Sequence, residues 1–381
     1  MLRQGGAGLR AGQERADADV THRVVTGGAV TTEVFGYDSS RLQLTSQTAM
    51  RGSTTLMSLT YNYQATAGQN GVGTTAGNSG QLMSISGLIN GTTESASYTY
   101  DLSNRLTTSS QTTNGVNAQR RFVYDRWGNR TGVWDATTGG NLIQSVVLQQ
   151  SGGVPTNRLN SVTTNSVQAT YTYDAAGNVI NDGTHSYVYD AENRLVSTDG
   201  GAVLCSYDHQ NRRVKKTTAS GTRHYVWEGS QVLAEYNGTT GAELLNYIYA
   251  GRMIAKSEGG VLRYFLSDRL SSRVVLDVNG SAVGVESQLP FGEALAPSGE
   301  QEKHTFTRYE RESETGMDYA LNRGYSSTGA RFQSPDPYRA SGYMVDPRSW
   351  NRYSYTRNDP VNRIDPLGLE DLPEGWSYQC T

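Results

Sequence analysis

Aspartates that precede prolines near the C-terminus are the candidate catalytic residues of this sequence. Asp365 begins the segment Asp-Pro-Leu-Gly-Leu, which ends at Leu369, and Asp336 precedes an upstream proline. Two carboxyl groups that lie close together can share one proton, so that one acts as base on water and the other as acid. Such a pair could hydrolyse a peptide bond. Asp-Pro is also a common turn starter, and Asp346 and Asp359 are competing candidates because each precedes a proline.

Two residues close to Asp365 could help to hold a nearby peptide bond against these carboxyl groups. Pro366 favours an extended backbone at Asp365, and Gly368 permits close approach of the chain to a neighbour. A peptide bond in the same chain would react faster than a free substrate, because it is held close to the catalytic groups. No nucleophile elbow, zinc-protease motif or phosphate loop is present, and the five histidines lack metal-ligand spacing, so we predict no metal and no cofactor.

Short β-hairpins must position these aspartates, because a hairpin-like repeat recurs through the chain before them. The repeat is Tyr-Asp, then Asn or Gly-Asn after a short gap, then Arg or an apolar residue. Tyr favours strands, and Gly and Asn tolerate the left-handed backbone of tight turns. One hairpin cannot bury its own face, whereas stacked hairpins can. The copies begin at Tyr37, Tyr100, Tyr124, Tyr173, Tyr189 and Tyr207.

The composition agrees with an all-β fold and argues against a nucleic-acid-binding or membrane-spanning protein. The 381 residues include 43 Gly and 24 Tyr but only 6 Phe, which favours turns and half-polar sheet faces. A net charge of −3 without a basic patch argues against a nucleic-acid partner. No apolar run reaches the ~18 residues of a membrane span, and residues 1–20 lack the apolar core of a signal peptide. We interpret Cys205 and Cys380 as free thiols.

The C-terminal third carries a series of motifs that resembles a known family. The Tyr-Asp copies are similar to YD repeats. The region from about Tyr264 to Leu369 is similar to the RHS repeat-associated core of bacterial RHS and insecticidal toxin-complex proteins. The matching motifs are Phe306-Thr307, Glu310-Arg311-Glu312-Ser313-Glu314-Thr315-Gly316, Arg331-Phe332, Ser334-Pro335-Asp336-Pro337, Trp350-Asn351-Arg352-Tyr353-Ser354-Tyr355, Asn358-Asp359-Pro360-Val361-Asn362 and Ile364-Asp365-Pro366-Leu367-Gly368-Leu369.

This resemblance implies both a fold and an activity. The fold is a shell of stacked β-hairpins that spirals around a hollow interior and is closed by a mostly β core domain. The activity is that of an aspartyl autoprotease with Asp336 and Asp365 as catalytic residues, which cuts between Leu369 and Glu370 and leaves a C-terminal toxin inside the shell. The implied partners are that toxin and the remainder of a larger shell. The implied location is outside the cell or at its surface, reached from the cytoplasm without a visible signal peptide.

We expect four regions along the chain: a polar lead over residues 1–30, the YD-repeat array over 31–255, the core domain over 256–369 and a short tail over 370–381. Twelve residues cannot form a toxin domain, so we expect part of a larger shell or a truncated remnant without activity. The alternative to an autoprotease is a non-enzymatic YD-repeat scaffold or surface protein that binds carbohydrate through Tyr and Asn faces. We interpret Arg331 and Arg352 as ordinary salt-bridge partners.

Overall fold

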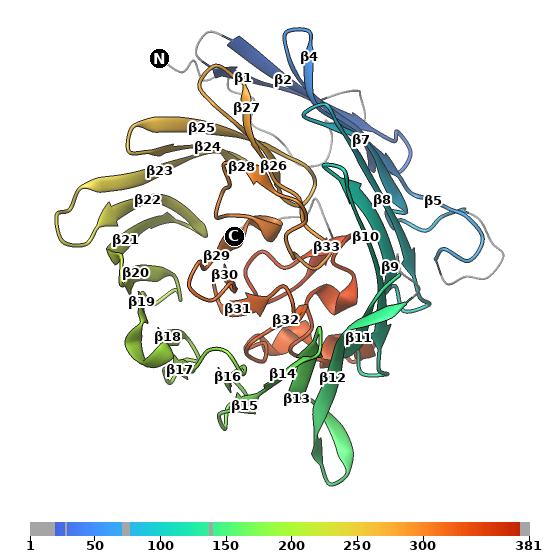
Figure 1. Cartoon of the computed structure of the whole chain (residues 1–381), viewed down its shortest axis with the longest axis vertical. Coiled ribbons are helices and arrows are strands. Elements are labelled where there is room, and N and C mark those ends of the chain that lie inside the picture. The colour runs from blue at the N-terminus through green and yellow to red at the C-terminus, as the bar shows by residue number, and fades with distance from the viewer. Residues whose placement is uncertain (1–19, 27–28, 71–76, 137–139, 374–381) are drawn as a thin grey trace.

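Antiparallel strands make up nearly all the regular structure of the chain in the computed structural model (Figure 1), which describes residues 20–26, 29–70, 77–136 and 140–373. Two 12-stranded sheets contain most of these strands, and chain neighbours are almost always sheet neighbours. This arrangement is what stacked hairpins produce, and it confirms the predicted all-β class.

The first sheet consists of β1 (Val20–Thr26), β2 (Ala29–Tyr37), β3 (Leu44–Arg51), β4 (Thr54–Asn62), β7 (Ser84–Ile89), β8 (Thr92–Tyr100), β9 (Leu106–Thr113), β10 (Val116–Tyr124), β11 (Arg130–Asp135), β12 (Asn141–Ser151), β13 (Val154–Thr164) and β14 (Val167–Thr170). The second consists of β17 (Tyr187–Tyr189), β18 (Leu195–Thr198), β19 (Val203–Tyr207), β20 (Arg213–Thr218), β21 (Gly221–Glu228), β22 (Gln231–Asn237), β23 (Glu243–Ala250), β24 (Arg252–Glu258), β25 (Val261–Ser267), β26 (Ser272–Leu276), β27 (Ala282–Val285) and β28 (Ser298–Gly299). Two small pairs complete the wall: β5 (Gln64–Ala65) with β6 (Gly77–Asn78), and β15 (Thr172–Tyr173) with β16 (Val179–Asn181).

Each YD turn is closed by its own aspartate. At Asp101, Oδ1 accepts the N–H groups of Ser103 and Arg105, both at 2.9 Å, and Oδ2 accepts Arg105 Nε at 2.7 Å. Asn104 takes the left-handed conformation that the turn needs, with φ of 58°. The turns at Asp190 and Asp208 repeat this pattern of contacts.

The tyrosines join successive hairpins to one another. The hydroxyl of Tyr124 donates to the carbonyl of Leu106 at 2.7 Å, and Tyr207 donates to Leu195 at the same distance. The apolar face of each ring therefore packs on the preceding hairpin, and its hydroxyl group donates a hydrogen bond to the backbone of that hairpin. This dual contact explains why Tyr replaces Phe as the main large residue of the array.

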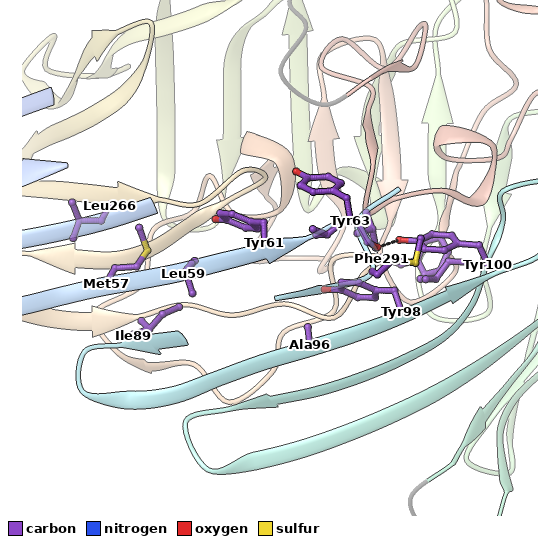
Figure 2. Packing of buried hydrophobic residues seen from close by; sticks show 14 of the residues in the cluster. Met57, Leu59, Tyr61, Tyr63, Ile89, Ala96, Tyr98, Tyr100, Leu266 and Phe291 are labelled. Carbon is purple, nitrogen blue, oxygen red and sulfur yellow. Dashed lines mark hydrogen bonds between the residues drawn. The ribbon is translucent and has the colours of Figure 1, made fainter. Parts of the chain in front are cut away.

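The end of the strand series packs against its beginning, so the wall closes into a ring (Figure 1). Leu266 of β25 lies in one buried cluster with Met57 and Leu59 of β4 and Ile89 of β7, as Figure 2 shows. Polar contacts reinforce the overlap: for example, Gln47 Nε2 donates to the Ser267 carbonyl at 2.7 Å.

The C-terminal segment fills the centre of this ring (Figure 1). Its elements are η2 (Phe306–Arg308), β29 (Glu310–Arg311), β30 (Asp318–Ala320), β31 (Arg323–Ser326), β32 (Arg331–Phe332), η3 (Arg339–Ser341), η4 (Pro347–Trp350), η5 (Thr356–Asn358), β33 (Arg363–Ile364) and β34 (Leu372–Pro373). One aromatic-rich cluster holds them together: Phe306, Tyr309, Ala320, Tyr325, Phe332 and Tyr355. Buried ion pairs from Arg213 of the wall to Glu310 and Glu312 attach this core to the ring.

Candidate active site

Asp365 lies directly after β33, where the chain turns towards the predicted cleavage point. Its Oδ1 accepts the N–H of Leu369 at 2.9 Å and the N–H of Glu370 at 3.2 Å. The buried Tyr309 hydroxyl donates to the Asp365 carbonyl and fixes the backbone. The carboxylate of Asp365 therefore contacts the nitrogen of the Leu369–Glu370 bond.

Asp336 is held at the other side of the site by the loop that follows β32. Its backbone N–H donates to the Arg352 carbonyl at 2.9 Å. Its Oδ1 accepts the N–H of Tyr338 at 2.8 Å, and its Oδ2 accepts the hydroxyl of Ser341 at 2.7 Å. These local bonds fix the side-chain rotamer, with one Asp336 oxygen turned towards β31.

Arg323 of β31 lies between the two aspartates. Its Nη2 is 3.0 Å from Asp365 Oδ2 and 3.5 Å from Asp336 Oδ2. Among the described residues no hydrogen bond joins the two carboxyl groups directly, so the guanidinium bridges them. The guanidinium also stacks on Phe332, 3.5 Å from the ring centroid, and donates to the carbonyls of Gly368 and Arg352.

The environment of Asp365 brings its pKa close enough to neutrality that a fraction of the group is protonated at physiological pH. Burial raises its pKa to about 6, and the nearby Asp336 carboxylate adds to the rise. The guanidinium of Arg323 and the Leu369 N–H oppose the rise, since both favour the ionised form. A carboxyl group with a pKa near 6 can supply a proton at physiological pH.

Both aspartates and the predicted scissile bond line one polar cavity. Asp336, Asp365, Leu369 and Glu370 contribute to its wall, with Arg323 between the aspartates. The site thus brings together two carboxyl groups, a peptide bond and space for a nucleophile.

The approach of the chain to this site depends on Gly368. Its φ is +67°, and a side chain built there would place Cβ only 2.6 Å from the Ala320 carbonyl oxygen. Asn322 Nδ2 donates to the Leu367 carbonyl at 2.9 Å and holds the turn from the other side.

The competing aspartates lie elsewhere, and neither lines this cavity. Asp346 caps η4 and pairs with Arg348 at 2.7 Å and Arg357 at 2.9 Å; the hydrogen bonds from Arg348 lower its pKa to about 2. Asp359 is buried and accepts Asn362 Nδ2 at 2.7 Å, and burial raises its pKa to about 7. Asp336 and Asp365 are therefore the pair that shares a site.

Arg323 is not among the site residues predicted from the sequence. Of the two arginines predicted to be salt-bridge partners, Arg331 donates to the Asn157 carbonyl. Arg352 Nη2 donates to the Asp336 backbone carbonyl at 2.8 Å but lies 3.9 Å from the Asp336 carboxylate. The available signal was the alternation of Arg323 with Tyr325 in a short strand, which places both on one face. Both side chains are buried, so this arginine belongs to the interior.

These features define a class of protein: a YD-repeat β shell closed into a ring, with a C-terminal core that holds two aspartates within it. Residues 30–361 match the family model described as Teneurin YD-shell, and the chain belongs to this family. It is an RHS/YD-repeat protein, which confirms the resemblance recognised in its sequence.

Curated relatives are similar over about half to three quarters of the chain. The tRNA3(Ser)-specific nuclease WapA of Bacillus spizizenii is 26% identical over 261 residues, which cover 65% of this chain and 11% of the relative. The probable deoxyribonuclease RhsB of Dickeya dadantii is 27% identical over 236 residues, which cover 54% of this chain and 16% of the relative. The double-stranded DNA deaminase toxin A of Burkholderia cenocepacia is 24% identical over 332 residues, which cover 71% of this chain and 22% of the relative. This chain thus spans a small part of each relative.

Solved structures confirm the shell fold. The crystal structure of TcdB2-TccC3-TEV matches 89% of this chain with a TM-score of 0.67 and 20% identity, and 18% of that chain is covered. TcdB2-TccC3-Cdc42 gives the same TM-score over 91% of this chain. In the described part of the chain, no helix is both long and apolar enough to cross a membrane.

Proposed function

We propose that this chain is the closing segment of a YD-repeat shell and that its core cuts the chain once, in cis, between Leu369 and Glu370. The observation that carries the proposal is the contact of Asp365 Oδ1 with the Glu370 nitrogen at 3.2 Å, inside a polar cavity shared with Asp336. A tethered peptide held against a carboxyl group needs little further ordering before it reacts.

The proposed roles of the two aspartates follow from their surroundings. Asp336 accepts hydrogen bonds from Tyr338 and Ser341 and faces Arg323, so it acts as the base that takes a proton from water. Asp365, buried beside the leaving nitrogen, supplies a proton to Glu370. Water adds across the amide, so that Leu369 gains a carboxylate and Glu370 gains an α-amine.

In a longer protein, the same reaction would separate the shell from whatever follows Leu369. The relatives include proteins named as a tRNA nuclease, a probable deoxyribonuclease and a DNA deaminase toxin, and this chain aligns with only 11–22% of their lengths. These names and lengths support a longer protein that carries a toxin after Leu369. The shell would contain this toxin, and the protein would be exported to the cell surface or beyond.

Refolding from denaturant in water enriched in heavy oxygen tests the reaction. The fragment that ends at Leu369 should carry one heavy oxygen atom in its new carboxylate, because hydrolysis takes that atom from solvent. A cut at an Asp-Pro bond instead, or no cut, would reject the proposal.

A further inference from the structure

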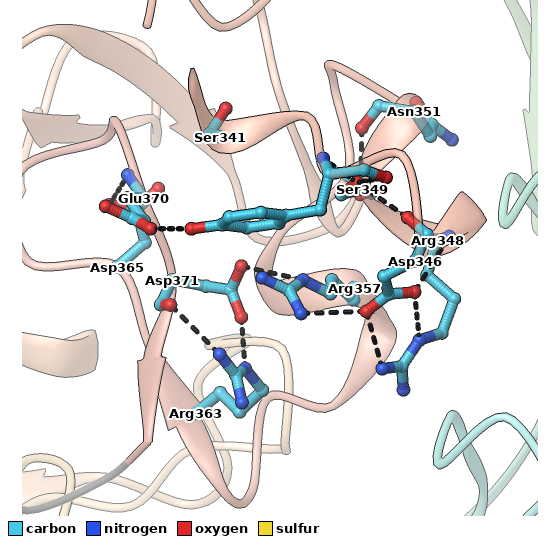
Figure 3. Close-up of polar contacts among 12 residues, drawn as sticks. Ser341, Asp346, Arg348, Ser349, Asn351, Arg357, Arg363, Asp365, Glu370 and Asp371 are labelled. Atoms are coloured by element: carbon cyan, nitrogen blue, oxygen red, sulfur yellow. Dashed lines mark hydrogen bonds and ion pairs between the residues drawn. The ribbon is translucent and has the colours of Figure 1, made fainter. Parts of the chain in front are cut away.

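The two residues after the proposed cut, Glu370 and Asp371, are both acidic, and the core binds both side chains (Figure 3). The Tyr343 hydroxyl donates to the Glu370 carboxylate. Arg357 and Arg363 contact the Asp371 carboxylate through different oxygens. These contacts lie on the downstream side of the bond and take no part in the proposed acid–base chemistry.

Asp371 is held most firmly. Arg357 Nε lies 3.0 Å from its Oδ1, whereas Arg363 Nε pairs with its Oδ2 and Arg363 Nη2 donates to its backbone carbonyl at 3.0 Å. The Asp371 side chain is only 13% exposed. A largely buried carboxylate with two guanidinium partners is bound more strongly than one in an exposed ion pair.

The arginine and tyrosine that make these contacts are fixed by other parts of the core. Arg357 Nη1 also pairs with Asp346 Oδ2 at 2.9 Å. The backbone N–H of Tyr343 donates to Ser349 Oγ at 2.7 Å, and Trp350 Nε1 donates to the Tyr343 carbonyl at 2.9 Å. The binding groups are therefore already in place, which reduces the entropy lost when they hold a ligand.

The backbone of the same segment is paired as well. β34 lies antiparallel to β33, with Leu372 opposite Ile364 and Pro373 opposite Arg363. The chain downstream of the proposed cut is thus bound through a strand pair as well as through its two acidic side chains.

We propose that the core contains a subsite for acidic residues immediately downstream of the cut, and that this subsite retains the head of the downstream chain after hydrolysis. The proposal rests on the proposed function for the cut itself. Hydrolysis leaves an α-ammonium group on Glu370, whose nitrogen lies 3.2 Å from Asp365 Oδ1. Hydrolysis therefore adds an attraction between the α-ammonium group of Glu370 and the carboxylate of Asp365 at any pH where Asp365 is ionised.

Cutting and release are consequently separate events. Release requires that the ion pairs of Asp371 be broken, by salt or by opening of the core. The subsite also discriminates by charge, because a lysine at position 371 would face the guanidinium groups of Arg357 and Arg363.

Hydrogen exchange of the amides of residues 370–372 tests this subsite in the full chain, whether or not the chain has been cut. We compare the wild type with Asp371→Asn, which keeps the shape but loses the charge, and with Tyr343→Phe, which loses one hydroxyl. Glu300→Gln is the matched control, because Glu300 also forms a two-point pair with an arginine, Arg263, but in the shell wall.

The expected result is slow exchange in the wild type and at least tenfold faster exchange in Asp371→Asn, with a smaller increase in Tyr343→Phe and none in Glu300→Gln. Wild-type exchange as fast as that of a free peptide, or unchanged by Asp371→Asn, would overturn the subsite. In cut protein, native mass spectrometry should show both pieces together at low salt, and their separation there would equally overturn it. The denaturing mass reports the cut independently, so failure of the proposed function and failure of the subsite are distinguishable.

Discussion

Asp365 Oδ1 lies 3.2 Å from the backbone nitrogen of Glu370, so the buried carboxyl group touches the peptide bond that follows Leu369. The N–H of Leu369 reaches the same oxygen at 2.9 Å. One short turn therefore carries both a candidate catalytic group and its candidate substrate.

Replacement of either aspartate of the pair should nearly abolish cleavage. We expect Asp336→Asn and Asp365→Asn each to slow the cut by roughly 10²–10⁴-fold, the range for loss of a general acid or base. Rates after refolding can be followed by denaturing mass spectrometry. Glu300→Gln serves as the control, because it breaks an ion pair in the wall and should leave the rate within a few-fold of wild type. A rate that survives Asp365→Asn would contradict the role given to that residue.

Cleavage should slow as pH rises through about 6. The pKa of Asp365 is raised to about 6 by burial, and the proposed acid acts only when it is protonated. Above that pH the rate should fall by about tenfold per pH unit. The check is a series of refolding experiments from pH 5 to pH 8. A rate that increases over this range would mean that Asp365 acts as the base instead.

Gly368→Ala should impair both the stability of the core and the cut. A side chain at φ +67° that meets the Ala320 carbonyl oxygen at 2.6 Å must displace the turn that presents Leu369. We expect a loss of about 1–3 kcal/mol in the free energy of unfolding, as for other strained backbone positions. Urea unfolding measures the loss, and Gly316→Ala is the matched control. Gly316 also has a positive φ, of 70°, but open space around its Cβ.

Asp359→Asn should stabilise the chain at alkaline pH. Burial raises the folded-state pKa of Asp359 to about 7 from its ordinary value of 3.8, so the folded protein holds this proton more tightly than the unfolded chain. The stability that this group contributes is complete below about pH 4 and is lost as pH rises through about 7.

The variant should therefore exceed wild type by roughly 1–4 kcal/mol at pH 8 and match it near pH 4. Urea unfolding at both values measures the difference between the two proteins. Equal stability at pH 8 would show that the Asp359 carboxylate is ionised without cost in the folded core.

The hairpin array could be predicted from the sequence because its determinants are local. Asp101 bonds within its own turn, and Asn104 adopts the left-handed backbone within the same few residues. The turn at Asp277 is equally local, since its carboxylate accepts the N–H groups of Asn279 and Ser281. The division into four regions, the cleavage and carbohydrate binding remain predictions, and Cys380 lies outside the described residues.

The candidate site could be predicted only in part from the sequence, because the residues around its two aspartates come from distant parts of the chain. Asp336 and Asp365 were identified by motif, but Arg323 reaches them only after β31 folds into the core. Tyr343 and Glu370 are 27 positions apart and meet through the loop before η4. No local pattern in the sequence specifies such contacts.

Self-cleavage after Leu369 is tested by the intact mass of the purified chain, measured under denaturing conditions for the wild type beside Asp365→Asn. The wild type should give a chain that ends at Leu369 together with a peptide that begins at Glu370, whereas the variant should retain Thr381. A wild-type chain that keeps its tail after refolding and prolonged incubation near pH 6 would contradict self-cleavage and leave the core as a structural plug of the shell.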